Sequence, residues 1–501
     1  MLKLQSSQHR VKNTYLYSER NTLISRLPRR PASFQVIFTM FNNLNLRAAT
    51  VRFRWTTFLS SGQMKLAAFM SFFFYWRQLV WVLNPADVET VHMTTQHRKS
   101  RRLVETFGYL FGERLVGNGL FSIPDYKTWK PRRKLYDPAF NRGYLKSLVP
   151  KFCASADLFL DKLQCLADGK TQVPLKIHIH QATLDVISKV AFASDVAREW
   201  KDQFDGLPTS TEHDVDSLVG KAFKGIQTNI RDPFFKFLHP FEVRNYREVA
   251  RTLRVIGRNC IQKRIKALND GKDVPHDILS YIIKAATSDV TADIESLVDD
   301  FVTFYIAGQE TTANTLAFAV VMVHQHPEVL ERILLEVEEV LGGKVSVTAE
   351  DLDKLKFTEQ VIDETLRIPG TISAVSKEAP IGGTTLSQYH IPAGTPMITP
   401  TAAMCRMPEY FEDPDSFNPS RFDPENKKPN PFIYFPFGVG HRSCIGRHFA
   451  MMEAKLILSR LVQTFQLTLP DGYKLEIVER TTRQPCDNIM CTLLPRKQHG
   501  S

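Results

Sequence analysis

The chain lacks the patterns that define several large classes of protein. Its 501 residues contain no evident internal repeat or low-complexity tract, which excludes a repeat architecture. The seven cysteines are odd in number and unpaired in spacing, so they do not form the disulfide framework of a secreted protein and favour a reducing, intracellular setting. No glycine-rich nicotinamide or flavin fingerprint is present. This excludes a chain that carries its own nicotinamide- or flavin-binding module of that type.

The chain also lacks a run of about 20 mainly apolar residues, which a membrane-spanning helix needs. The best candidate, residues 66–83, is interrupted by two polar side chains. We interpret it instead as two strands, 69–76 and 79–83, on either side of a polar turn. The Asn84-Pro85 pair then predicts the start of a helix.

Most of the net charge of +11 belongs to an N-terminal arm. Residues 1–60 hold ten Lys or Arg against the single acid Glu19, whereas residues 61–501 hold 54 basic and 52 acidic residues. We therefore predict a basic, atypical arm (1–60) and a catalytic domain (61–501), and we exclude nucleic-acid binding because no module motif appears. The acid-poor arm resembles a mitochondrial transit peptide, and a flexible tail or an altered N-terminus are the alternative interpretations.

One cysteine near the C-terminus stands in an unusual environment. Cys444 lies in the stretch 437–446, which reads FGVGHRSCIG. A lone cysteine is usually a small core residue, and tetrahedral zinc needs four ligands in paired spacings that this chain does not have. Glycines allow the backbone to approach a flat macrocycle, and backbone N–H groups can lower the pKa of the thiol. The pattern therefore favours one axial sulfur on a haem iron. The predicted cofactor-binding residues of this stretch are Phe437, Gly438, Arg442 and Gly446.

The stretch resembles the cysteine-loop signature of the cytochrome P450 family of haem-thiolate monooxygenases. Three further motifs match in the expected order, from about residue 80 to the end. The resemblance implies a mainly α fold with small β-sheets, in which haem b lies between a long central helix and the cysteine loop, with Cys444 on the iron. Segments 301–308 and 410–414 resemble cholesterol 24-hydroxylase-like members, which implies a sterol or similar lipid as substrate.

The first of these motifs is Trp-x-x-x-Arg, at Trp129 and Arg133. Four residues make about one helical turn, so both side chains share a face and can donate to one anionic group. The resemblance makes that group a haem propionate, although such pairs also line solvated helix faces. The preceding loop, 117–121, is expected to border the substrate cavity.

The second motif lies in a long apolar helix predicted over 290–324. Gly308 costs about 1 kcal/mol against alanine inside a helix, and an acid beside a threonine is unusual in a buried stretch. Residues that are unfavourable in a buried helix, gathered in one place, indicate a functional site. The resemblance implies that Glu310 relays protons and that Thr311 hydrogen-bonds the oxygen substrate, with Gly308 opening the helix groove for it. A kinked helix with a satisfied threonine is the structural alternative.

The third motif is Glu-x-x-Arg, at Glu364 and Arg367. A buried pair needs further partners, and the resemblance supplies Arg421 from a later loop as a structural triad. The segment 368–377 departs from the family, because Lys377 stands where relatives have an arginine for a propionate, and lysine is a poorer planar donor. The predicted substrate-pocket residues are Phe304, Ala307, Ala374 and Val375.

Residues 232–241 form an apolar loop between two helical stretches, and ordinary burial is one interpretation. The other is a lip at the substrate entrance that dips into a membrane, as in the family. Arg447 and nearby cations are candidates for docking a redox partner.

These motifs predict a monooxygenase that uses O2 and hydroxylates a lipophilic substrate. The resemblance implies NADPH-cytochrome P450 reductase as partner at the cytosolic face of the endoplasmic reticulum membrane, or a ferredoxin if the arm directs the chain to mitochondria. A haem-thiolate isomerase that does not activate oxygen is an alternative, but such relatives tend to lack the acid-threonine pair. A haem-binding sensor is the non-catalytic alternative.

Overall fold

The computed structural model describes residues 68–71, 78–193, 214–232, 234–288, 293–344 and 346–496. All of them belong to one compact unit, Thr56–Ser501. The basic arm 1–60 lies outside the described residues, so its boundary stays a prediction.

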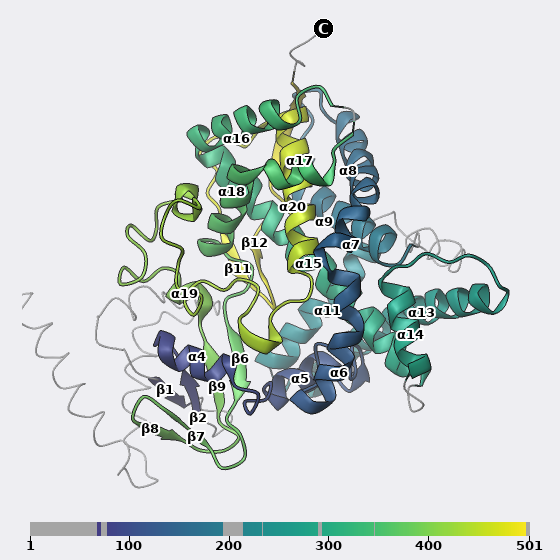
Figure 1. Cartoon of the computed structure of the whole chain (residues 1–501), viewed down its shortest axis with the longest axis vertical. Helices are drawn as coiled ribbons and strands as arrows, with labels where there is room; N and C mark the ends of the chain where they lie inside the picture. Colours follow the sequence, from purple (N-terminus) through teal and green to yellow (C-terminus); the bar gives the residue numbers. More distant parts are fainter. Residues whose placement is uncertain are drawn as a thin grey trace, which may run out of the picture. The chain divides into compact units, whose positions relative to one another are not determined.

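Helices dominate the described chain (Figure 1). In chain order they are α4 (Pro85–Met93), α5 (Arg101–Gly108), α6 (Tyr126–Tyr136), α7 (Arg142–Ser147), α8 (Val149–Gln164), α9 (Leu175–Val186), α11 (Asp214–Arg231), α12 (Phe235–Leu238), α13 (Pro240–Asn269), α14 (Ile278–Ser288), α15 (Ile294–Gln325), α16 (Pro327–Val340), α17 (Ala349–Lys354), α18 (Lys356–Arg367), α19 (Thr401–Met404) and α20 (Arg447–Thr464). Short 3-10 or π segments are η2 (Asp137–Phe140), η3 (Ile187–Ala191), η4 (Pro419–Phe422) and η5 (Gly440–Arg442).

The strands are short. They are β1 (Ala68–Ser71), β2 (Gln78–Trp81), β3 (Tyr109–Leu110), β4 (Glu113–Arg114), β5 (Val173–Pro174), β6 (Val375–Glu378), β7 (Thr384–Leu386), β8 (Tyr389–Ile391), β9 (Pro396–Thr399), β10 (Phe465–Thr468), β11 (Ile477–Glu479), β12 (Arg483–Pro485) and β13 (Met490–Pro495). The largest sheet has the order β1-β2-β9-β6, in which only the β2–β9 pair is parallel. A mainly α fold with small sheets is thus confirmed.

The central helix α15 is 32 residues long and buried along most of its length. A helix that is apolar around its whole circumference must lie inside a large core. The side chain of Asp293 caps its first turn by accepting a hydrogen bond from the backbone N–H of Ser296 at 2.8 Å. Pro327, just beyond its end, begins the next helix. The helix predicted over 290–324 is therefore confirmed, with its start at Ile294.

The two predicted strands form an antiparallel pair that is shorter than expected. β1 pairs with β2 so that Ala68 faces Trp81, whereas residues 72–77 lie outside the described residues. The second strand ends at Trp81 and not at residue 83, because Asn84 already caps the next helix by accepting from the N–H of Ala86 at 2.9 Å. The helix after Asn84 begins at Pro85, as predicted.

Candidate active site

The cysteine loop between η5 and α20 presents the thiol of Cys444. The N–H of Cys444 donates to the carbonyl of Phe437 at 2.7 Å, which closes the loop. Gly438 and Gly440 have φ values of +74° and +73°, which favour glycine. A Cβ on Gly440 would also lie 2.4 Å from the carbonyl oxygen of His92. The loop therefore depends on its glycines for its shape.

The Cys444 side chain is exposed to solvent, although many protein atoms surround it. This burial raises the pKa of the thiol, while the backbone N–H of Gly446 and the charges of Arg133 and Lys99 act in the opposite direction. Burial outweighs these groups, so the pKa of the free thiol is raised, but the same N–H group and cations lie where they would favour a thiolate bound to a metal.

Three positions in the middle of α15, Ala307, Gly308 and Thr311, are at least partly open to solvent although the helix around them is buried. Ala307 is exposed and Thr311 is half-buried, and the hydroxyl of Thr311 donates to the carbonyl of Ala307 at 2.9 Å. Gly308 faces elsewhere, because a Cβ on it would lie 2.6 Å from Ile187 in η3. The missing side chain of Gly308 is therefore needed for packing against η3, which the sequence alone did not indicate.

Glu310 is buried in a polar cluster built from three elements. Its Oε1 accepts from Asn314 Nδ2 at 3.2 Å, from Thr482 Oγ1 at 3.3 Å and from Gln484 Nε2 at 3.5 Å. The Nδ1 atom of His180, on α9, lies 3.8 Å from Glu310 Oε2. His180 and Gln484 carry no sequence signal that links them to Glu310, because only the fold brings α9 and β12 to this point of α15.

Three cations form a cluster that the sequence only partly predicted. Lys377 on β6 is buried, and Lys99 Nζ donates to the carbonyl of Phe121 at 2.7 Å. Arg442 stacks 4.3 Å from the ring of Trp129. Burial, reinforced by Arg442, lowers the pKa of Lys377 to about 8, and burial lowers the pKa of Arg442 to about 10.

Within the described part of the chain, none of Lys99, Lys377 and Arg442 forms an ion pair with a carboxylate. Burial lowers the pKa of Lys99, and the charges of Arg442 and Lys377 lower it further. Such a cluster is stabilised by an external anion. The two propionates of a haem fit this donor set. Lys99 was missed in the sequence because it stands in the basic run 97–102, which reads as a solvated surface.

Arg133 contacts the cysteine loop directly. Its Nε pairs with Asp137 at 2.6 Å, and its Nη1 donates to the carbonyl of Ser443 at 2.8 Å. Trp129, on the same helix α6, is buried. The structure thus brings both residues to the cysteine loop, with Trp129 under Arg442 and Arg133 on the backbone beside Cys444.

The predicted triad also comes together. Arg367 and Glu364 are fully buried and form a bidentate pair at 2.7 and 2.8 Å. Arg421 approaches Glu364 at 3.4 Å and donates to the carbonyl of Asp413 at 2.8 Å. Arg367 further donates to three backbone carbonyls, those of Cys405, Pro414 and Ser416.

The four predicted substrate-pocket residues differ in exposure. Ala307 is exposed, and Ala374 and Val375 are half-buried. Phe304 is buried, and its ring packs 5.2 Å from the ring of Tyr136 and 5.4 Å from that of Phe140.

Comparison with known proteins agrees with this geometry. The family model "Cytochrome P450" matches residues 31–492. Cytochrome P450 4d2 of Drosophila melanogaster is 28% identical over 83% of this chain and 84% of its own length. Cytochrome P450 3A6 of Oryctolagus cuniculus is 30% identical over 70% of each chain.

Solved structures share the fold. The crystal structure of the cytochrome P450DA heme domain superposes with a TM-score of 0.73 at 24% identity, covering 86% of this chain and 90% of that one. A mutant of the same heme domain gives a TM-score of 0.73 at 25% identity, covering 84% of this chain and 89% of that one.

The fold and the thiol-bearing loop define a haem-thiolate protein. The chain belongs to the cytochrome P450 family. It is a haem-dependent monooxygenase whose iron is bound by Cys444, and it acts with O2, a redox partner and a lipophilic substrate. Among the described residues, no helix combines the length and the hydropathy that a membrane crossing requires.

Proposed function

We propose that the chain hydroxylates a sterol or a similar bulky lipid. The observation that carries this proposal is the open stretch of α15 at Ala307 and Thr311, in a mainly apolar part of the helix that begins within the segment 301–308, which resembles sterol hydroxylases. An apolar surface around one hydroxyl binds a lipophilic substrate and leaves few polar groups to be desolvated. Ala374 lies just before β6 and Val375 begins it. Both are half-buried and add to the wall of the proposed substrate pocket.

Haem, when bound, supplies the activation of O2 and the oxidation of an unactivated C–H bond, and the cysteine sulfur favours cleavage of the O–O bond. Thr311 holds a proton at its Oγ1, close to the open surface of α15. Glu310 lies one residue earlier and is held by three donors on its Oε1. We assign Glu310 to proton supply and Thr311 to proton delivery.

The chain's own residues hold the cofactor at two ends. Cys444 binds the iron, while Phe437, Gly438 and Gly446 shape the loop around it. Lys99 joins the predicted set at the propionate end, because its half-buried side chain lies beside the cations Arg442 and Lys377. The full propionate set is Trp129, Arg133, Lys377, Arg442 and Lys99.

The redox partner docks, in this proposal, near the start of α20. Arg447 is exposed and follows the cysteine loop directly. We assign NADPH-cytochrome P450 reductase as that partner and the cytosolic face of the endoplasmic reticulum as the location. If the basic arm 1–60 is a transit peptide, the redox partner is instead a ferredoxin in the mitochondrion. Residues 61–501 form the proposed catalytic domain.

The segment 232–241, expected to be a loop, contains α12 and the start of α13, and its exposure favours the membrane-dipping interpretation over burial. Four of its apolar side chains are exposed, although apolar groups of this size are usually buried. Lys236 adds a cation to the same loop. We call this set the lip, and it consists of Phe234 (55% exposed), Phe237 (77%), Leu238 (68%) and Phe241 (81%).

Turnover by the reconstituted holoenzyme tests the proposal. With NADPH, reductase and a panel of sterols and fatty acids, we expect an oxygenated sterol product. Cys444→Ala should abolish haem retention and the thiolate-type Soret band of the reduced carbon monoxide complex. Thr311→Ala should keep haem but divert electrons to hydrogen peroxide, whereas the buried neighbour variant Thr312→Ala should stay coupled. Normal coupling in Thr311→Ala would contradict the proton assignment, and oxidation of fatty acids alone would contradict the sterol assignment.

A further inference from the structure

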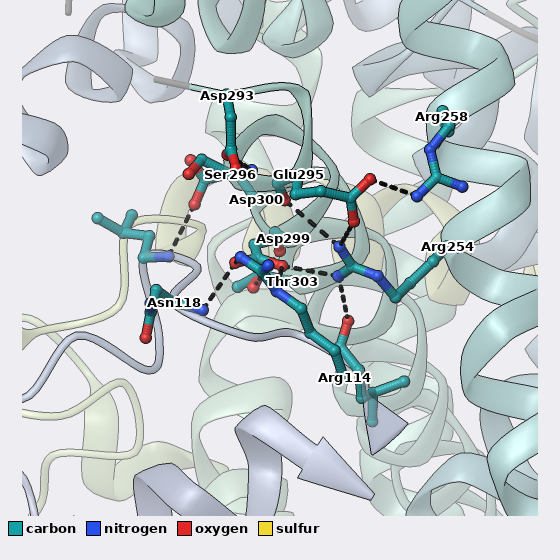
Figure 2. Close-up of polar contacts among 12 residues, drawn as sticks. Arg114, Asn118, Arg254, Arg258, Asp293, Glu295, Ser296, Asp299, Asp300 and Thr303 are labelled. Carbon is teal, nitrogen blue, oxygen red and sulfur yellow. Dashed lines mark hydrogen bonds and ion pairs between the residues drawn. The ribbon is translucent and has the colours of Figure 1, made fainter. Parts of the chain in front are cut away.

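Two adjacent carboxylates near the start of α15 have no role in the chemistry described above. Asp299 and Asp300 are both 0% exposed. Asp299 accepts two hydrogen bonds from Arg114, at 3.0 and 2.7 Å, and one from Arg254 Nη1 at 2.7 Å. Figure 2 shows Asp299 between these two guanidinium groups. Two buried acids side by side are costly to fold and are retained only with full compensation.

Both carboxylates also bind backbone N–H groups of one loop. Asp299 Oδ2 accepts from the N–H of Asn118 at 2.7 Å, and Asp300 Oδ1 accepts from the N–H of Leu120 at 2.8 Å. Arg132 on α6 donates to Asp300 at 2.8 Å and to the carbonyl of Asn118 at 3.1 Å. Tyr136 also donates to Asp300. We call residues 114–121 the clamped loop.

Two glycines allow the clamped loop to approach α15 this closely. A Cβ on Gly117 would lie 2.3 Å from an Asp299 carboxylate oxygen, and its φ of +41° is itself unfavourable for other residues. A Cβ on Gly119 would lie 2.2 Å from Thr303 Oγ1 and 2.7 Å from the Asp299 carbonyl. The loop sequence and the two acids therefore match each other.

The clamped loop leads directly into the cation cluster. Phe121, its last residue, accepts from Lys99 through its carbonyl at 2.7 Å and lies under the Lys99 ammonium at 3.6 Å. Ile123 and Pro124, just beyond, accept from Arg442 at 2.9 and 3.0 Å. The loop and the residues just after it therefore contact two cations of the haem site, so a shift of the loop would displace their partners.

We propose that Asp299 and Asp300 are positioning residues that fix the clamped loop on α15 and thereby determine which lipophilic ligands fit beside the haem. This inference rests on the haem-monooxygenase activity but not on the sterol assignment.

Hydrogen exchange of the holoenzyme tests the first half of the proposal. Asp299→Asn should speed amide exchange in residues 115–121 at least tenfold. The matched control is Glu295→Gln, because Glu295 pairs with Arg254 and Arg258 in the same network (Figure 2), and its described hydrogen bonds include none to residues 115–121. It should leave exchange of the loop unchanged. Equal exchange in Asp299→Asn and the unmodified chain would overturn the clamp.

Ligand affinity tests the second half. Dissociation constants from the Soret shift are measured for two probes, cholesterol, which is broad, and lauric acid, which is slim. Asp299→Asn should change the ratio of the two constants at least fivefold, and Glu295→Gln should not. Faster amide exchange with an unchanged ratio of the two dissociation constants would show that the clamp is only structural and would contradict the proposal.

Glycine variants keep the test decisive if Asp299→Asn fails to fold. Gly119→Ala displaces the loop without removing a charge and should give the same faster exchange and altered ratio. Gly220→Ala, on α11 with no atom within 4 Å of the added Cβ, is its control and should give neither. Both readouts need no turnover, so a failure to hydroxylate any sterol would contradict the proposed function and leave this result interpretable.

Discussion

At the scale of single residues, Lys99 illustrates how a structure identifies a binding group that a sequence hides. Its ammonium is buried beside Arg442 and Lys377, and burial lowers its pKa. A charge-assisted hydrogen bond to an anion contributes about 1.5–3 kcal/mol. We therefore expect Lys99→Met to speed loss of haem about tenfold, measured as transfer to an excess of an apoprotein acceptor.

The control for this prediction is Lys134→Met, which removes an exposed lysine from α6. It should leave the rate of haem loss unchanged. Equal rates in both variants would show that Lys99 does not contact a propionate.

Asp363 gives a pH-dependent prediction of stability. Burial, with a smaller effect of Glu359, raises the pKa of Asp363 from 3.8 to about 6, although Tyr434 donates to its carboxylate at 2.9 Å. Between pH 4 and 6 the unfolded chain therefore loses this proton before the folded chain does, and the folded state becomes less stable as the pH rises. Above about pH 6 the folded state carries the full destabilisation that results from ionising Asp363.

Asp363→Asn removes this ionisation and should stabilise the fold at pH 7.5 by about 2 kcal/mol. The gain should shrink toward zero as the pH falls through 6 to 4, which denaturant unfolding at several pH values measures. Glu412→Gln, at an exposed site, should show no such trend. A gain that is constant with pH would mean that the pKa of Asp363 does not differ between the folded and the unfolded chain.

The site residues that could best be predicted are those whose adjacent residues in the sequence indicate a role. Cys444 stands among glycines and a cation that have no other reason to cluster, so its role was readable. Lys99 and His180 lack such neighbours. Their contacts lie 22 and more than 120 positions away along the chain, and only tertiary packing supplies them.

At the scale of elements, the pair on α18 fixes the segment that leads to η4. Arg367→Met leaves Glu364 as a fully buried charge and frees three carbonyls. Breaking such a pair costs about 3–5 kcal/mol. Arg421→Met removes a partner that is 15% exposed and 3.4 Å away, so about 1 kcal/mol is expected.

Urea unfolding of the holoenzyme measures both values. Arg101→Met is the control, since its pair with Glu105 is largely exposed and should contribute less than about 0.5 kcal/mol. A larger loss for Arg421→Met than for Arg367→Met would reverse the order that burial predicts. An unchanged Soret band in the folded fraction would support a structural role of the triad.

Helices were more predictable than strands for a physical reason. The helix over 290–324 could be recognised because its apolar character continues through many turns, and α15 differs from it mainly in its first residues. The strands are two to six residues long, so their period-2 pattern is short. β9, which joins β2 and β6 in one sheet, is far from β2 in sequence and had no local signal that links it there.

At the scale of the whole molecule, charge and apolar surface occupy different parts of the chain. The arm 1–60 carries nine of the eleven net positive charges, while residues 61–501 are nearly neutral. The lip belongs to the second part. Membrane attachment through the arm would depend on anionic lipid and fall with salt, whereas attachment through the lip would depend on apolar burial and would not.

The lip therefore gives a prediction that distinguishes membrane attachment through the lip from attachment through the arm. Burying one phenylalanine contributes about 1.5–3 kcal/mol, so replacing two of them should weaken binding at least about 30-fold. We expect the double variant Phe237→Asp and Phe241→Asp to lose binding to neutral phosphatidylcholine vesicles at 0.5 M salt, measured by co-sedimentation. Leu335→Asp, at a 66% exposed leucine on α16, should bind as the unmodified chain does. Since neutral vesicles at high salt suppress attraction to the arm, undiminished binding by the double variant would rule out the lip as the membrane contact.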